Sequence, residues 1–490
     1  MTQFGQNGHL TEKNGNGPRV RAVLPGAKAF SPLRNPAFRF LWISMFCSTT
    51  GMQTQFFARG LLAYELGGTA AAIGVVGLGQ AIPGLILSII GGVVADRVER
   101  RTILIVGQAL TAILAIIVAV MVKTEVMTIP YLFISGLLLG TLMAFGGPAR
   151  QAIVPEIAGQ NELMNALALN NAGMNLSRIA TPSFSAALVS ISGIDIGGLF
   201  VAQACLNSIS LACLLALPFA KKGSRAVVAA AEGSEPASGS RPRRPRRSMA
   251  HDLAEGFRYV VRSPILVTLL AMGLVPTLLG QSYQSFLPVF AKDVFGDGIE
   301  RNAGAIGVMG TVSGIGALAG SLTVALMAAY PRRTLIQLVS GLGFGFLLAS
   351  FAIQSNYIAA VLCLGGVGFM SSFFQSLNTT MTMTASDPQY HGRVMSINQL
   401  TFSMTAFGTF FTGYLIDWVG RTVIGPLELE GVQVAFFGIG LIMTAFLVTV
   451  TIFNPSYRHL EQDDLRRFGQ SAKEETQVEA AAADRRGLSL

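Results

Sequence analysis

The stretch GGVVADRVERR, residues 91–101, closes a long apolar run with one acid followed by four further charged residues. Charges are scarce in this chain: only 12% of its residues are Asp, Glu, Lys or Arg, against about 25% in ordinary soluble proteins. This deficit indicates a lipid environment, in which a charge cluster behind an apolar run is typical of a membrane boundary. A second stretch, GYLIDWVGR at residues 413–421, has the same appearance. The two are the same device only if they lie on the same side of the membrane.

Apolar segments long enough to cross a bilayer, which takes about 20 residues each, recur along the whole chain. They cover residues 37–64, 70–95, 102–122, 128–147, 163–191, 197–220, 265–291, 303–329, 334–353, 357–384, 394–417 and 432–453. The sequence therefore predicts an all-α integral membrane protein with twelve transmembrane helices.

The positions of Lys and Arg predict the orientation, because loops rich in these residues stay in the cytoplasm. With the N-terminus inside, only four of the 35 cations fall on the outer side: Lys123, Lys292, Arg301 and Arg421. We therefore expect a multi-pass protein of the cytoplasmic (inner) membrane with both termini in the cytoplasm. The same count puts GGVVADRVERR inside and GYLIDWVGR at the outer end of the eleventh span. The two stretches are then not the same device, and their likeness is interpreted as coincidence.

An internal repeat divides the chain into two halves. At an offset of 233 residues, IGVVG (73–77) aligns with IGVMG (306–310), and at 232, RRTIL (100–104) aligns with RRTLI (332–336). The matches follow one another in order, so the sequence predicts two parallel six-helix repeats, an arrangement that places a substrate site between the halves near the membrane midplane. The predicted parts are a cytoplasmic N-terminal segment (1–36), the first half (37–220), a linker with an interfacial helix (221–264), the second half (265–453) and a cytoplasmic tail (454–490).

The linker is rich in Ala, Gly, Ser, Pro and Arg and includes the basic run RPRRPRR at residues 241–247. Such a run can bind nucleic acid, but beside a membrane it favours attraction to anionic lipid headgroups and a role in setting topology. We therefore expect membrane lipids as partners and no nucleic acid. The following segment, 249–264, spaces Leu253, Phe257 and Val260 along one face, which predicts an interfacial helix.

Twelve spans in two repeated halves, a basic central loop and the stretch GVVADRVERR together resemble the major facilitator superfamily. Gly92, Asp96, Arg97, Arg100 and Arg101 match the loop pattern of that superfamily, whereas Val94 and Glu99 depart from it. Two further stretches, GPARQAIVPEIAGQNELMNALALN (147–170) and DPQYHGRVMSINQ (387–399), resemble the branch of enterobactin exporters and macrolide efflux proteins. The resemblance implies a secondary transporter that exports a small siderophore-like or drug-like molecule, by proton antiport.

The 92–101 loop is also expected to act as a gate. Asp96, at the inner end of the second span, can approach the start of the eleventh, where unpaired backbone N–H groups attract an anion. Arg393 stands at that same end, and Arg97 or Arg100 can reach Asp387. These contacts would hold the halves together on the cytoplasmic side. The alternative is that the charges only fix the topology.

Polar residues inside the spans predict the substrate path, because a charge within the bilayer is costly unless it faces a cavity or a partner. They lie on the first, fifth and seventh spans: Gln53, Gln55, Arg59, Asn171, Asn175, Arg178, Gln281, Tyr283 and Gln284. The alternative is interhelical hydrogen bonding without cargo. Two cations without a buried acid indicate an anionic or electron-rich substrate.

Other classes of function fit the sequence less well. The four His residues fall in loops, with no nucleophile and base at a catalytic spacing, and no phosphate-binding loop is present, so we expect no enzyme. The four Cys residues lie in apolar segments without metal-ligand spacing, which predicts neither metal nor cofactor. No acid lies in mid-span to carry a coupling proton. A monomeric exporter is therefore predicted, with a lipid flippase or a transport-inactive sensor as alternatives.

Overall fold

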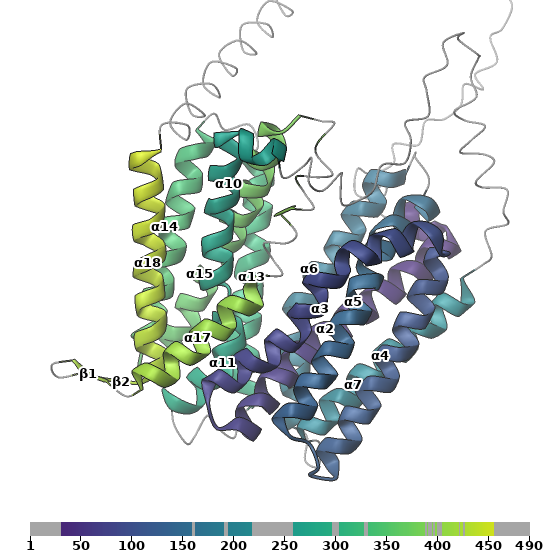
Figure 1. Cartoon of the computed structure of the whole chain (residues 1–490), viewed down its shortest axis with the longest axis horizontal. Helices are drawn as coiled ribbons and strands as arrows, with labels where there is room; N and C mark the ends of the chain where they lie inside the picture. Colours follow the sequence, from purple (N-terminus) through teal and green to yellow (C-terminus); the bar gives the residue numbers. More distant parts are fainter. Residues whose placement is uncertain are drawn as a thin grey trace, which may run out of the picture.

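The protein is described here from a computed structural model, which covers residues 31–158, 162–190, 195–217, 258–295, 303–327, 332–387, 390, 394, 397–398, 404–420, 422–424 and 427–454. Its described elements are almost all helical (Figure 1). The first group of helices comprises α2 (Pro36–Gly67), α3 (Ala70–Arg97), α4 (Arg100–Lys123), α5 (Ile129–Ala158), α6 (Leu163–Ser190) and α7 (Ile196–Ala216), preceded by the short η1 (Ser31–Arg34).

The second group begins with one long segment that is interrupted in the middle: α10 (Pro264–Val275), the π-turn η3 (Pro276–Gly280) and α11 (Tyr283–Asp293). It continues with α13 (Ala303–Leu326), α14 (Arg333–Ala352), α15 (Tyr357–Ala385), α17 (Thr405–Val419) and α18 (Gly431–Phe453). A small antiparallel hairpin, β1 (Thr422–Ile424) with β2 (Leu427–Leu429), connects α17 to α18, with Thr422 opposite Leu429.

Nine helical segments within the described residues are long and apolar enough to cross a membrane. They are α3, α4, α5, α7, the α10–α11 segment, α13, α14, α15 and α18. The long helices α2 and α6 carry the polar residues noted above, and 15 residues of α17 are described. A multi-pass membrane protein is confirmed, and the count of twelve spans stays a prediction.

Local sequence explains where several helices begin and end. The Asn35 side chain accepts a hydrogen bond from the Ala37 N–H at the start of α2, and Gly68 ends that helix at a φ of 63°, which favours glycine. Asp195 caps α7 in the same way, and Asn356 caps α15. Of the predicted interfacial helix, residues 258–262 are described and are helical; the rest of the linker lies outside the described residues.

Each group is held together by close helix pairs. In the first group α3 packs along α5, and α2 and α4 pack along α7; in the second, α13 packs along α15, and α14 along both α15 and α18. Glycines allow backbones to touch: a Cβ atom at Gly140 would lie 2.1 Å from the Gln80 carbonyl oxygen, and one at Gly316 would lie 2.0 Å from that of Gly365. Small residues at such contacts are the usual basis of helix packing in membranes.

The two groups meet along α6 with α13 and along α3 with α17. In Figure 1 their ribbons come together at the lower end, where the β1–β2 hairpin lies, and stand apart at the upper end. The lower end is called the joined end below. Here the Tyr64 hydroxyl of α2 donates to the Asp293 carboxylate of α11 at 2.7 Å.

Candidate functional site

Small residues bring α6 and α13 into direct contact. A Cβ atom at Gly307 would lie 2.4 Å from that of Ala186, and one at Gly310 would lie 2.7 Å from the Pro182 side chain. Thr311 adds a hydrogen bond to the Ile179 carbonyl oxygen at 3.2 Å. One face of α6 is therefore occupied by the second group of helices.

Another face of α6 packs against α2. The Trp42 indole lies beside Gly173, and the hydroxyls of Ser177 and Thr50 are 3.0 Å apart. Successive residues of an α-helix are about 100° apart, so these two contact faces leave a strip of α6 between them.

The predicted polar residues of α6 occupy this strip. Arg178 and Asn171 are exposed and Asn175 is half-buried, between a helix of the first group and a helix of the second. Within the part of the chain that the structure describes, no acidic side chain pairs with Arg178. The strip is suited to contact a ligand that lies between the two groups, because its polar atoms are not consumed by packing.

Tyr283 of the second group lies close to this region but is not part of its surface. Its ring is fully buried, and its hydroxyl lies 2.7 Å from that of Ser313 on α13. One residue further along, Gln284 is exposed and donates to the half-buried Gln281 at 3.2 Å. The helix α13 therefore contacts both α6 and α11, which carry the predicted residues of the fifth and seventh spans. Ser313 is an addition, because a lone Ser in a glycine-rich helix gives no signal in the sequence.

The predicted residues of the first span lie elsewhere. Arg59 is only 4% exposed; its guanidinium donates to the Leu132 carbonyl oxygen at 3.2 Å and to the Ser135 hydroxyl at 2.6 Å, both on α5. Gln55, also 4% exposed, accepts from Gln203 of α7 at 2.7 Å. Both side chains therefore point into the first group of helices, although α2 itself contacts α11: a Cβ atom at Gly60 would lie 3.6 Å from the Ser285 carbonyl oxygen. Gln53 is half-buried on α2.

The predicted gating residues are described only in part. The side chains of Gly92, Asp96, Arg97 and Arg393 lie outside the described residues. Arg101 donates to the carbonyl oxygens of Leu214 at 3.1 Å and Leu215 at 3.0 Å, which ties the start of α4 to the end of α7.

On the second group, Asp387 is exposed and accepts a hydrogen bond from the Tyr259 hydroxyl at 3.3 Å. The Tyr259 ring stacks on that of Tyr390, with their centroids 4.1 Å apart. Asp387 therefore ties the helical segment before α10 to the end of α15. Its pairing with Arg97 or Arg100 stays a prediction.

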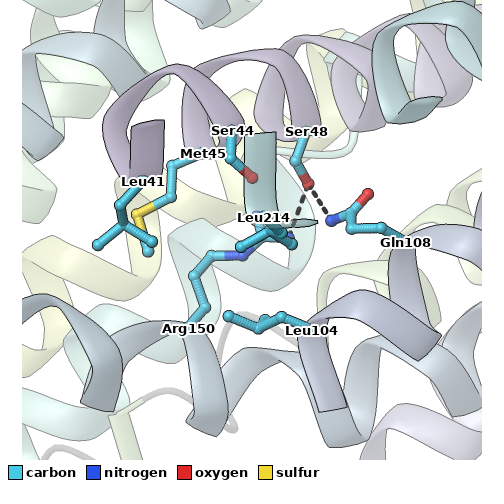
Figure 2. Close-up of a pocket in the computed structure, with 8 residues that line it drawn as sticks. All are labelled: Leu41, Ser44, Met45, Ser48, Leu104, Gln108, Arg150 and Leu214. Atoms are coloured by element: carbon cyan, nitrogen blue, oxygen red, sulfur yellow. Dashed lines mark hydrogen bonds between the residues drawn. The ribbon is translucent and has the colours of Figure 1, made fainter. Parts of the chain in front are cut away.

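One more arginine reaches into the first group of helices (Figure 2). Arg150 of α5 and Gln108 of α4 both donate to the Ser48 hydroxyl of α2, at 2.8 Å and 2.7 Å. They line a cavity of about 10 Å³ together with Leu41, Ser44, Met45, Leu104 and Leu214. This space suits one water molecule and no cargo, so the cluster is a structural link among four helices.

The chain is similar to known transport proteins along most of its length. The enterobactin exporter of Shigella boydii serotype 18 is 24% identical over 90% of this chain and 95% of its own length, and that of Escherichia coli O81 gives the same figures. Among solved structures, the nucleoside transporter NupG superposes with a TM-score of 0.63 at 16% identity, covering 85% of this chain and all of its own. A bacterial homologue of the lysosomal transporter Spinster superposes with a TM-score of 0.59 at 14% identity, covering 91% of this chain and 99% of its own.

The pattern of one family spans nearly the whole chain. Residues 27–487 match the family described as transmembrane secretion effectors. The two solved transporters show that the fold is shared; at such low identity they do not indicate a shared substrate. The chain therefore belongs to the transmembrane secretion effector family of the major facilitator superfamily, and it is a membrane efflux transporter.

Proposed function

We propose that the protein exports a small anionic or electron-rich molecule from the cytoplasm, by alternating access between two six-helix halves. In this proposal α2, α6 and α17 also cross the membrane, which with the nine apolar segments gives twelve spans. The two halves cover residues 37–220 and 265–453. It treats the chain as a monomer. The coupling proton is taken from the family resemblance alone.

The anionic class of the proposed substrate is supported chiefly by the exposed side chain of Arg178. Its cation is exposed between α2 and α13, and within the described residues no acid neutralises it. Charge-assisted hydrogen bonds from a guanidinium to an oxyanion are among the strongest polar contacts. Asn171 and Asn175 offer further donors at helical spacing on α6, and Gln284 offers an exposed donor on α11, next in the chain to the buried Tyr283.

The proposed orientation of the protein in the membrane follows from the positions of Lys and Arg in the loops. They put the joined end outside, so the described arrangement would be open toward the cytoplasm, where an exporter collects its cargo. Siderophore-like molecules, which carry catecholate or carboxylate oxygens, fit this surface better than cationic drugs do.

Retention in cells tests the proposal. Cells with and without the protein are loaded with a panel of catecholates, anionic dyes and cationic dyes, and the retained amounts are compared. We expect anionic members to leave faster when the parent protein is present, and export to be lost with Arg178→Gln. Arg258→Gln, at an exposed arginine outside the spans, is the matched control and should export normally. Export that is unchanged by Arg178→Gln, or that is confined to cations, would contradict the proposal.

A further inference from the structure

We propose that Asp417 is a latch that closes the joined end, by capping α3 from the opposite group of helices. The inference rests on the proposed function, because a latch matters only if the two groups separate and rejoin. Asp417 is the acid of the stretch GYLIDWVGR, residues 413–421.

The Asp417 carboxylate uses both of its oxygens across the interface. One oxygen accepts from the Ala70 N–H at 2.9 Å and the other from the Ala71 N–H at 2.8 Å. These are the first two residues of α3, whose N–H groups have no partner within the helix. A carboxylate there gains from hydrogen bonding and from the helix dipole. Helix caps normally come from an adjacent residue, whereas this one is 347 positions away.

The cap forms only because the two backbones are in contact. A Cβ atom at Gly413 would lie 2.6 Å from the Ala70 carbonyl oxygen, and one at Gly74 would lie 2.5 Å from the Phe410 Cα. An Asp side chain is short, so a separation of a few ångströms between α3 and α17 would break both hydrogen bonds. The contact is therefore specific to the joined arrangement.

The likeness of GYLIDWVGR to GGVVADRVERR gains a physical meaning from this contact. The helices α3 and α17 run antiparallel. Ala70, at the start of α3, lies beside Gly413 near the end of α17, and Gly74 lies beside Phe410, which comes earlier in α17. Asp417 lies near the end of α17 and caps the start of α3. Asp96 lies near the end of α3 and is predicted to approach the start of α17. Asp417 thus does at the start of α3 what Asp96 is predicted to do at the start of α17, at the opposite end of the helix pair.

A thiol reporter measures separation of the groups without any cargo. Ala186 of α6 is 1% exposed and packs against Gly307 of α13, away from Asp417. In a background with Cys47, Cys205, Cys213 and Cys363 replaced by Ser, Ala186→Cys should react with a polar maleimide only when the groups part. The purified protein is used in lipid nanodiscs, and the initial rate of modification is recorded.

Asp417→Asn keeps one acceptor and removes the charge. Because Asp417 is exposed, we expect a modest effect, a rise of about threefold in the modification rate at low salt. Asp195→Asn is the matched control, since Asp195 caps α7 within one group, and it should leave the rate unchanged. High salt should raise the rate of the parent and leave that of Asp417→Asn nearly constant, because screening weakens only the charged latch.

A steric variant keeps the inference testable if the Asn variant folds poorly. Gly413→Ala retains the carboxylate but forces α17 away from α3, so it should also raise the rate. Modification of Asp417→Asn at the parent rate and with the parent's salt dependence would overturn the latch, even if export is observed. A faster rate without any exported compound would support the latch and leave the proposed function in doubt.

Discussion

Arg59 and Arg178 are both arginines in the middle of apolar helices, yet the structure gives them opposite environments. Arg59 is buried against α5 and its guanidinium is used by a carbonyl and a hydroxyl. Arg178 is exposed on the strip between α2 and α13. The two bonds of the buried Arg59 link α2 to α5, although its Nε has no partner within the described residues, whereas the exposed Arg178 remains available to a ligand. An arginine within a long helix can therefore link neighbouring helices or contact a ligand, depending on the face of the helix that carries it.

Removal of the buried arginine should have the largest effect on stability. Arg59→Ala deletes both hydrogen bonds to α5 and leaves a space beside Gly136, so we expect the free energy of unfolding to fall by about 3 kcal/mol. Thermal unfolding in detergent, followed by the loss of monodisperse protein, measures the change. Arg178→Ala is the comparison and should lie within about 0.5 kcal/mol of the parent. If both variants unfolded at the same temperature, Arg59 would not contribute more to stability than Arg178 does.

The converse effect concerns binding. Arg178→Gln removes the only charge of the strip, so the affinity for an anionic cargo should fall about tenfold or more, while the melting temperature stays near that of the parent. Arg178→Lys should recover part of the loss, because a point charge replaces the planar fork. Titration with a compound identified by the retention assay gives the dissociation constants. An affinity that is insensitive to the charge at position 178 would show that the strip does not contact the cargo.

The spacing of polar residues does not show that Arg59 and Gln55 of α2 pack against α5 and α7, for a physical reason. Asn171, Asn175 and Arg178 recur at helical spacing, and this spacing alone puts them on one face. Gln55 and Arg59 recur at the same spacing, but a membrane helix is apolar on the lipid side and on the protein side alike, so the pattern does not reveal which neighbour the polar face meets.

Contacts between distant residues were equally beyond the sequence. The helix boundaries follow from local signals such as Asn35 and Gly68, and the predicted span 37–64 lies within α2. The partner of Asp417 depends on how α17 approaches α3, which no local pattern encodes. Ser313 becomes part of the site only through its contact with Tyr283.

A smaller effect on stability is expected from the buried contact between Tyr283 and Ser313. Tyr283→Phe removes the hydroxyl that pairs with Ser313, so stability should fall by about 1 kcal/mol. Ser313→Ala should cost a similar amount, and the double variant should cost less than the sum of the two, because both changes remove one interaction. A thermal melt of the four proteins provides the cycle. Strict additivity would mean that the 2.7 Å contact contributes nothing.

The smallest effect tests the role of Gln55 directly. Its bond with Gln203 is an interhelical hydrogen bond inside the first group, and such bonds in membranes contribute about 0.6 kcal/mol on average. Gln55→Leu should therefore lower the melting temperature slightly and leave cargo affinity unchanged, whereas Gln284→Leu, at an exposed glutamine of α11, should weaken affinity with little effect on melting. Opposite outcomes for these two glutamines would extend the contrast between Arg59 and Arg178 to uncharged residues. If Gln55→Leu instead reduced affinity as much as Gln284→Leu, the first span would belong to the cargo path despite its burial.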